Sequence, residues 1–89
     1  MVRTKNINGT SDNNPPCGYV SWKEYWEKNM KRKFSKCSCV ECGKPAEVGA
    51  HVMKDNDSNK WYIVPLCIGC NNRSSKEVFW VNEADLLSV

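Results

Sequence analysis

Two short segments decide the fold: CVECG at residues 39–43 and CIGC at residues 67–70. Each carries two cysteines with two residues between them, and 24 residues separate the two pairs. Thiolates with this spacing can bind one ion if the backbone turns tightly, and two such pairs on either side of a hairpin are typical of structural zinc sites. We therefore expect Cys39, Cys42, Cys67 and Cys70 to bind one structural Zn²⁺.

Two further cysteines and one histidine could compete for this ion. Cys37 precedes the first pair, but Cys37 and Cys42 lack the two-residue spacer that the second pair has, so we expect Cys37 and Cys17 to be free thiols. His51 would enter a Cys₃His site only if it lay near the cysteine pairs. Its position within a predicted strand disfavours that alternative.

The length of 89 residues allows one small domain. A core of that size supplies only about 3–5 kcal/mol of net stability. Zinc binding contributes an apparent ~10–16 kcal/mol at neutral pH, so we expect the metal-free chain to be largely unfolded over residues 37–76.

The start of the chain favours a reducing compartment. Residues 1–16 contain no apolar segment of the kind found in secretory signals, and no segment approaches the roughly 20 apolar residues that span a bilayer. We therefore expect a cytoplasmic protein without a membrane partner, in which the cysteines bind metal. Three disulfides are the alternative, and they would leave the paired spacing unexplained.

The sequence before the first cysteine pair predicts a tail and a helix. Residues 1–18 are rich in Asn, Ser, Thr, Gly and Pro, which predicts a flexible tail before a single domain over residues 19–89. Ser21 and Glu24 have the spacing of a capping box, which predicts a helix start at residue 22. Aromatic and apolar residues then recur every three or four positions as far as Phe34, so we expect an amphipathic helix to about residue 35.

The region between the cysteine pairs has strand periodicity. Apolar residues alternate over 46–53, β-branched and aromatic residues fill 61–66, and a polar segment over 54–60 separates them, which predicts a β-hairpin. Pro65 should lie at the end or edge of its strand. A short helix over 71–76, a strand over 78–81 and a turn capped by Asn82 should follow. The predicted fold class is α+β, a small zinc-stabilised treble clef with an N-terminal amphipathic helix.

The ordered motifs of residues 39–73 resemble the zinc-containing HNH endonucleases, including the phage junction-resolving endonucleases. They are Cys39-x₂-Cys42-Gly43, then Gly49-Ala50-His51-Val52, then Tyr62-Ile-Val-Pro-Leu-Cys67-x₂-Cys70-Asn71. The resemblance covers less than half of the chain and depends on the whole ordered set.

The resemblance implies roles for individual residues. In that family a His at the end of the first hairpin strand is the general base, and the residues before it and after the last zinc cysteine bind a catalytic divalent ion. His51 matches the base, and Asn71 matches a ligand of a second metal such as Mg²⁺. Ala50 occupies the other ligand position, where a methyl group cannot bind Mg²⁺. Tyr62 stands near the usual position of the Asn that orients the base.

Six cations are candidates for contact with nucleic acid: Lys28, Lys31, Arg32, Lys33, Lys36 and Arg73. Five lie in and after the C-terminal half of the predicted helix, where cations also suit the helix dipole without any ligand. Arg73 should lie near a helix N-terminus, which attracts phosphate. The formal net charge of +3 decides little, since four thiolates subtract four charges and Zn²⁺ adds two, which leaves +1.

We therefore expect a small HNH-like zinc protein that binds DNA or RNA and is a degenerate relative of the nucleases. One alternative is an interaction module in which zinc holds a surface for a protein partner, and exposed Trp22 and Trp26 would mark that surface. The other alternative is an active metal-dependent endonuclease, which requires His51 as its base.

Overall fold

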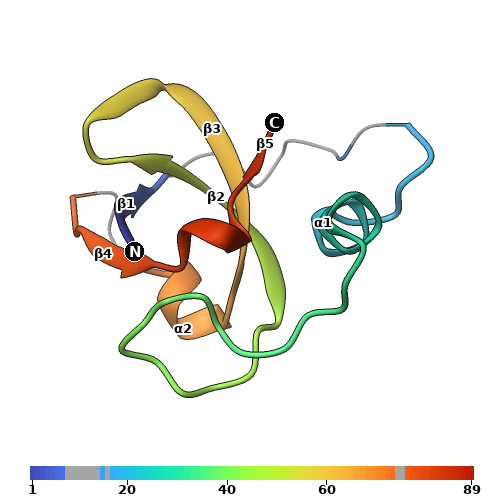
Figure 1. Ribbon diagram of the computed structural model, residues 1–89, viewed down its shortest axis with the longest axis horizontal. Coiled ribbons are helices and arrows are strands. Elements are labelled where there is room, and N and C mark those ends of the chain that lie inside the picture. Colours follow the sequence, from blue (N-terminus) through green and yellow to red (C-terminus); the bar gives the residue numbers. More distant parts are fainter. Residues whose placement is uncertain (8–14, 16, 74–75) are drawn as a thin grey trace.

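One antiparallel sheet with strand order β4-β1-β2-β3-β5 forms the centre of the protein (Figure 1). The computed structural model describes residues 1–7, 15, 17–73 and 76–89. The elements in chain order are β1 (Val2–Asn6), α1 (Trp22–Met30), β2 (Val48–Lys54), β3 (Asp57–Leu66), α2 (Ile68–Asn71), β4 (Phe79–Val81), the 3₁₀ helix η1 (Glu83–Asp85) and β5 (Leu87–Ser88). The protein is thus a small α+β domain. Within the described ranges, neither α-helix is long and apolar enough to cross a membrane.

The long strands β2 and β3 form the hairpin that the sequence predicts. Their pairing runs from Val48 opposite Leu66 to Lys54 opposite Asp57, so most of the polar segment expected as a loop extends β3 instead. Pro65 lies next to the end of β3, beyond the two residues that pair with β5. This position needs no N–H donor toward a further strand, which explains why a proline is tolerated there.

The first residues of the chain form β1, between β2 and β4, and this corrects the expectation that all of residues 1–18 form a flexible tail. Val2 of β1 packs against the core, but the two fully buried side chains of the strand, Thr4 and Asn6, are polar. The Thr4 hydroxyl donates to the Phe79 carbonyl oxygen at 3.1 Å, and Asn6 Nδ2 donates to three backbone carbonyls at the end of α2, at 3.0–3.2 Å. Because apolar alternation is missing here, hydropathy did not reveal the strand. Residues 8–14 and 16 of the expected tail lie outside the described residues.

Helix α1 begins at the residue that the capping box predicts. The Ser21 hydroxyl accepts a hydrogen bond from the Glu24 backbone N–H at 3.1 Å. The helix ends at Met30 rather than near residue 35, because Lys31 adopts the left-handed conformation at φ 59° and acts as the C-cap. Since β1 precedes it, α1 is not the N-terminal element. It packs on β2, β3 and β5.

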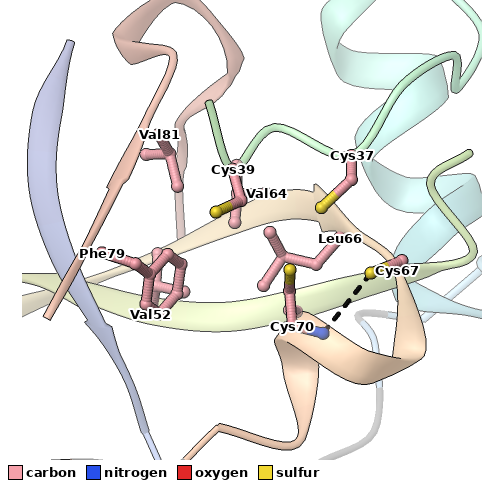
Figure 2. Close-up of a cluster of buried hydrophobic side chains, with 10 residues drawn as sticks. Cys37, Cys39, Val52, Val64, Leu66, Cys67, Cys70, Phe79 and Val81 are labelled. Carbon is pink, nitrogen blue, oxygen red and sulfur yellow. Dashed lines mark hydrogen bonds between the residues drawn. The ribbon is translucent and has the colours of Figure 1, made fainter. Parts of the chain in front are cut away.

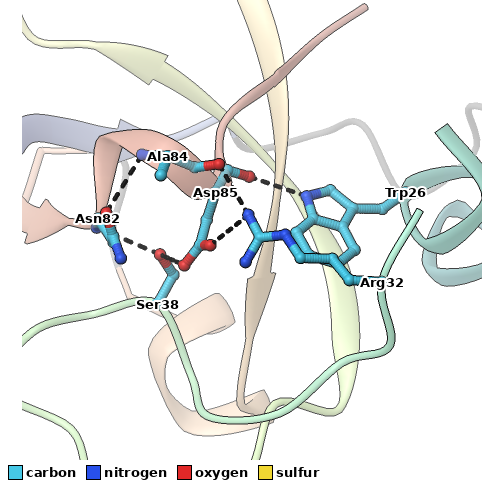
Figure 3. A network of polar contacts seen from close by, with 6 residues as sticks. All are labelled: Trp26, Arg32, Ser38, Asn82, Ala84 and Asp85. Carbon is cyan, nitrogen blue, oxygen red and sulfur yellow. Dashed lines mark hydrogen bonds and ion pairs between the residues drawn. The ribbon is translucent and has the colours of Figure 1, made fainter. Parts of the chain in front are cut away.

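A polar network fixes α1 to η1, and Figure 3 shows its members converging on Asp85. Trp26 is 1% exposed, and its Nε1 donates to the Asp85 carbonyl oxygen at 2.8 Å. The Asp85 carboxylate binds the Arg32 guanidinium at 2.8 Å and accepts a hydrogen bond from the Ser38 hydroxyl at 2.8 Å. Through its carbonyl oxygen and its carboxylate, Asp85 therefore joins η1 to α1 and to the segment after it, which are distant in the sequence.

The remaining elements follow the predicted order with shifted bounds. Helix α2 lies directly after Cys67 rather than over residues 71–76, of which 74 and 75 are outside the described part of the chain. Strand β4 is one residue shorter than expected at its start. Asn82 caps the following turn as predicted, because its Oδ1 accepts from the Ala84 N–H at 3.1 Å.

The two faces of the sheet carry different environments. One face holds the hydrophobic core, in which Ala50, Val52, Val64 and Leu66 pack with buried cysteines. The other face includes His51, and α1 covers the part of this face that lies over β2, β3 and β5. We call the two the cysteine face and the α1 face.

The contact between β2 and α1 is close enough to require glycine at position 49. A Cβ there would lie 2.8 Å from the Trp22 carbonyl carbon and 3.0 Å from the Lys23 nitrogen. We predict that Gly49→Ala displaces α1 and lowers the free energy of unfolding by about 1–3 kcal/mol, measured by urea denaturation of the metal-loaded protein. Gly43→Ala is the matched control, since no atom lies within 4 Å of its Cβ and its φ is not positive. Equal stability of the two variants would contradict the prediction.

Candidate metal centre

Four cysteine thiols converge on the cysteine face. The Sγ atoms of Cys37, Cys42, Cys67 and Cys70 all lie within 4.8 Å of one another, and those of Cys42 and Cys67 are 3.7 Å apart. Four sulfurs bound at about 2.3 Å in a tetrahedron around one ion are about 3.8 Å from one another. The cluster can therefore hold a metal ion.

The first two thiols come from the loop over residues 36–45. A backbone bridge between Lys36 and Pro45 closes the base of this loop, next to Cys37. At its tip the Cys42 N–H donates to the Cys39 carbonyl oxygen at 3.0 Å, which turns the backbone sharply before Cys42. The loop thus returns on itself and brings two thiols to one side.

The other two thiols flank the start of α2. Cys67 is the N-cap residue, and its Sγ accepts from the Cys70 N–H at 3.4 Å. Both side chains are buried, and Figure 2 shows their sulfurs pointing toward that of Cys37. The turn at the start of a helix therefore supplies the tight geometry that the Cys-x₂-Cys spacing requires.

Cys37 takes the place that the spacing assigned to Cys39. Cys39 is 1% exposed, its backbone pairs with Val81 of β4, and its side chain belongs to the hydrophobic core. In Figure 2 its sulfur lies apart from the other sulfurs drawn. The structure thus brings Cys37 into the cluster in place of Cys39, whereas the spacing predicted Cys39 as a ligand and Cys37 as a free thiol. The physical reason is the pairing with β4, which anchors Cys39 over the core.

The donor set favours a thiophilic ion. Four sulfurs in a closed arrangement are typical of zinc or iron, whereas Mg²⁺ and Ca²⁺ prefer oxygen ligands. The 3.7 Å between the Cys42 and Cys67 sulfurs far exceeds a disulfide bond of about 2.05 Å. The residues present therefore fit a structural zinc ion.

Hydrogen bonding and burial shift the pKa values of the cysteine thiols in opposite directions. The hydrogen bond from the Cys70 backbone N–H lowers the pKa of Cys67 to about 7. Burial raises the pKa of Cys37 and raises that of Cys70 strongly. Cys67 thus ionises more readily than Cys37 or Cys70 near neutral pH, and metal binding must displace protons from those two thiols.

The structure separates His51 from the cysteines. Its ring lies on the α1 face, edge-on to Trp22 at 4.6 Å and to Trp61 at 5.9 Å between ring centroids. His51 is 8% exposed, and this burial lowers its pKa. Ala50, the residue before it, is buried on the cysteine face.

Asn71 is exposed at the end of α2, and its carbonyl oxygen accepts a hydrogen bond from Asn6. Tyr62 packs against the hydrophobic core on the cysteine face. Within the part of the chain that the structure describes, the cysteine cluster is the only group of three or more His, Cys, Asp or Glu side chains whose ligand atoms converge.

Three of the six candidate cations lie within 3.6 Å of an acidic side chain. Arg32 binds the Asp85 carboxylate within the network of Figure 3. Lys28 and Arg73 each lie 3.6 Å from a glutamate carboxylate four residues away in the chain. These interactions provide a structural role for Arg32 and reduce the charge that Lys28 and Arg73 offer to a ligand.

The other three cations project from the segment after α1. The Lys33 side chain is 91% exposed, with its Nζ 4.0 Å from Glu27. Lys31 and Lys36 are exposed and form no ion pair with a described residue. A hollow of about 500 Å³ beside α1 is lined by five cationic side chains and two carboxylates. Its lining residues are Val20, Ser21, Lys23, Glu24, Glu27, Lys28, Lys31, Arg32 and Lys33.

No protein-family model, curated protein or solved structure matches this chain. The HNH resemblance therefore stays a prediction carried by the motifs of residues 39–73. The geometry adds a cluster of four thiols that can hold one metal ion.

Replacing Cys37 and Cys39 separately tests the ligand set. We predict that Cys37→Ala weakens metal binding by about a hundredfold, because an apparent ~10–16 kcal/mol shared by four ligands is about 3 kcal/mol for each. Competition with a zinc chelator measures the affinity, and the absorption of a Co²⁺-loaded sample reports the number of thiolates. Cys39→Ala is the matched control and should keep all four thiolates. Loss of a thiolate in Cys39→Ala but not in Cys37→Ala would restore the ligand set predicted from the spacing.

The burial of His51 predicts a lowered pKa of its imidazole. NMR can measure this pKa without ambiguity, since His51 is the only histidine. Its pKa is lowered below the ordinary 6.5, so the folded state favours the neutral ring. This contribution to stability is fully present above pH 6.5 and decreases as the pH falls toward the folded pKa. Titration of the imidazole signals should give a midpoint below 6.5, and a midpoint above 6.5 would contradict the prediction.

Proposed function

We propose that this protein is a small HNH-like zinc-binding module that binds nucleic acid without cleaving it. The observation that carries the proposal is the cysteine cluster, whose four sulfurs have the spacing and donor chemistry of a structural zinc site. Bound Zn²⁺ would supply folding energy and fix the loop over residues 36–45 to the start of α2.

The exposed lysines beside this loop support contact with a polyanion. Lys31, Lys33 and Lys36 follow α1 directly, and the last of them stands at the base of the loop that supplies Cys37 and Cys42. The metal ion would hold the base of this segment in place. Exposed lysines on a fixed segment attract phosphates over a distance and need no base-specific contacts.

Two features support binding without cleavage. The methyl group of Ala50 offers no ligand for a catalytic cation, so Asn71 would have to bind the ion without its usual partner. The His51 ring is enclosed between two tryptophans, where a phosphodiester has no direct access. We therefore expect no Mg²⁺- or Ni²⁺-dependent cleavage of DNA. Cleavage that His51→Ala abolished would instead support an active endonuclease.

A protein-interaction module is less well supported. Trp26, one of the two aromatic residues that would mark its surface, is buried and bound to Asp85. Trp22 is half-buried against His51. Neither tryptophan of α1 thus offers the fully exposed ring that a protein hot spot requires before binding.

Neutralising Lys31 and Lys36, which form no ion pair with any described residue, tests the proposal. We predict that Lys31→Gln/Lys36→Gln weakens binding to a 16-base-pair DNA duplex and lowers the slope of log K against log salt by about 2, since each phosphate contact contributes about 0.9. Fluorescence anisotropy from 25 to 200 mM salt measures both quantities.

The control variant Lys60→Gln/Lys76→Gln removes the same charge from β3 and from the loop before β4. It should bind the duplex with a slope close to that of the original protein. Equal losses in the two variants would show a general effect of net charge and would contradict binding through the segment after α1. Absence of any salt-sensitive binding to DNA or RNA would overturn the proposed function.

A further inference from the structure

The part of the α1 face that α1 leaves uncovered carries an exposed tryptophan beside two cations. Trp80 of β4 is 42% exposed and lies directly opposite Arg3 of β1 in the sheet register. Lys5 lies two residues after Arg3 on β1, opposite Met53 of β2. The side chains of Trp80, Arg3, Lys5 and Met53 therefore share one face. Figure 1 shows β4 and β1 at the end of the sheet remote from α1. We call this surface the β4–β1 face.

The charge of the β4–β1 face is positive even after its internal ion pairs. One carboxylate, Asp55, serves both cations, with Arg3 at 3.5 Å and Lys5 at 4.0 Å. The side chains of Arg3 and Lys5 keep 54% and 32% of their area exposed. Two cations that share one carboxylate retain capacity for a further anion, and exposed pairs of this kind exchange partners at little cost.

A hollow of about 260 Å³ is lined in part by Trp80. It is smaller than the roughly 300–1,000 Å³ of pockets for drug-sized ligands, which suits a single ring system. Its walls combine an indole with hydrogen-bonding groups. The lining residues are Met1, Val2, Arg3, Asp55, Asn56 and Trp80.

We propose that the β4–β1 face binds single-stranded nucleic acid, with one unpaired base stacked on Trp80 and the adjoining phosphates on Arg3 and Lys5. An exposed indole on a sheet can stack on any base face, and cations beside it follow the backbone of the strand. Bases inside a duplex already stack on their neighbours, so only an unpaired base can reach the ring. The inference rests on the proposed function for the class of ligand, but it uses different residues.

Binding of a fluorescein-labelled ten-nucleotide oligo-dT to the zinc-loaded protein tests the inference. Trp80→Leu should weaken binding by about 5- to 150-fold, the range that corresponds to loss of stacking by one base. Trp80→Phe keeps an aromatic face and should stay within about threefold of the original affinity. Trp61→Leu is the matched control on β3, at the α1 end of the same face, and should leave the affinity within about twofold. Amide NMR spectra verify that each variant is folded.

The outcomes separate this inference from the proposed function. Loss of oligo-dT binding in Trp80→Leu, with binding kept in Trp80→Phe and Trp61→Leu, supports the β4–β1 face, whatever Lys31→Gln/Lys36→Gln does to duplex binding. Unchanged oligo-dT affinity in Trp80→Leu overturns the inference, and duplex binding that still depends on Lys31 and Lys36 then leaves the proposed function intact. Equal losses in Trp80→Leu and Trp61→Leu also overturn it, because they show no preference for this face.

Discussion

The fold depends on the convergence of four thiols, two from the loop over residues 36–45 and two from the start of α2. A chain of 89 residues has a core worth only about 3–5 kcal/mol, whereas a structural metal ion supplies an apparent ~10–16 kcal/mol. The cluster joins the loop over residues 36–45 to α2 and lies against the cysteine face of the sheet. Metal binding and the packing of that face should therefore be one cooperative event.

Buried polar side chains hold further elements, β1 and α1, in place by hydrogen bonds and an ion pair. Asn6 binds three carbonyls at the end of α2, which ties β1 to the segment that carries Cys67 and Cys70. Its Oδ1 is buried and has no hydrogen-bond partner among the described residues, a cost of about 1–3 kcal/mol that the three donated bonds must offset. Asp85 plays the corresponding role for α1 through Trp26 and Arg32. Specific polar contacts thus place the elements that the small apolar core could not position alone.

The two faces of the sheet carry different groups, with the buried cysteines on one face and the exposed Trp80 and Arg3 on the other. Its cysteine face is closed by the thiol cluster and apolar side chains, while its α1 face is covered at one end and open at the other. The two cationic surfaces differ in kind. Among the lysines after α1 the ring of Phe34 is half-buried, whereas the exposed Trp80 lies beside Arg3 and combines a flat ring with charge. This difference is the physical basis for assigning duplex contact to one surface and an unpaired base to the other.

The sequence by itself determined the local features: the start of α1 from Ser21 and Glu24, the β2–β3 hairpin, and the cap at Asn82. Each of these follows from periodicity or from a hydrogen bond between near neighbours, so local sequence contains the cause. Only the tertiary structure decided that β1 is a strand, because its buried side chains are polar and find their partners near the other end of the chain. It also decided that Cys37 rather than Cys39 joins the cluster. The pairing of Cys39 with Val81, 42 residues further along the chain, holds Cys39 over the core and leaves Cys37 to join the cluster.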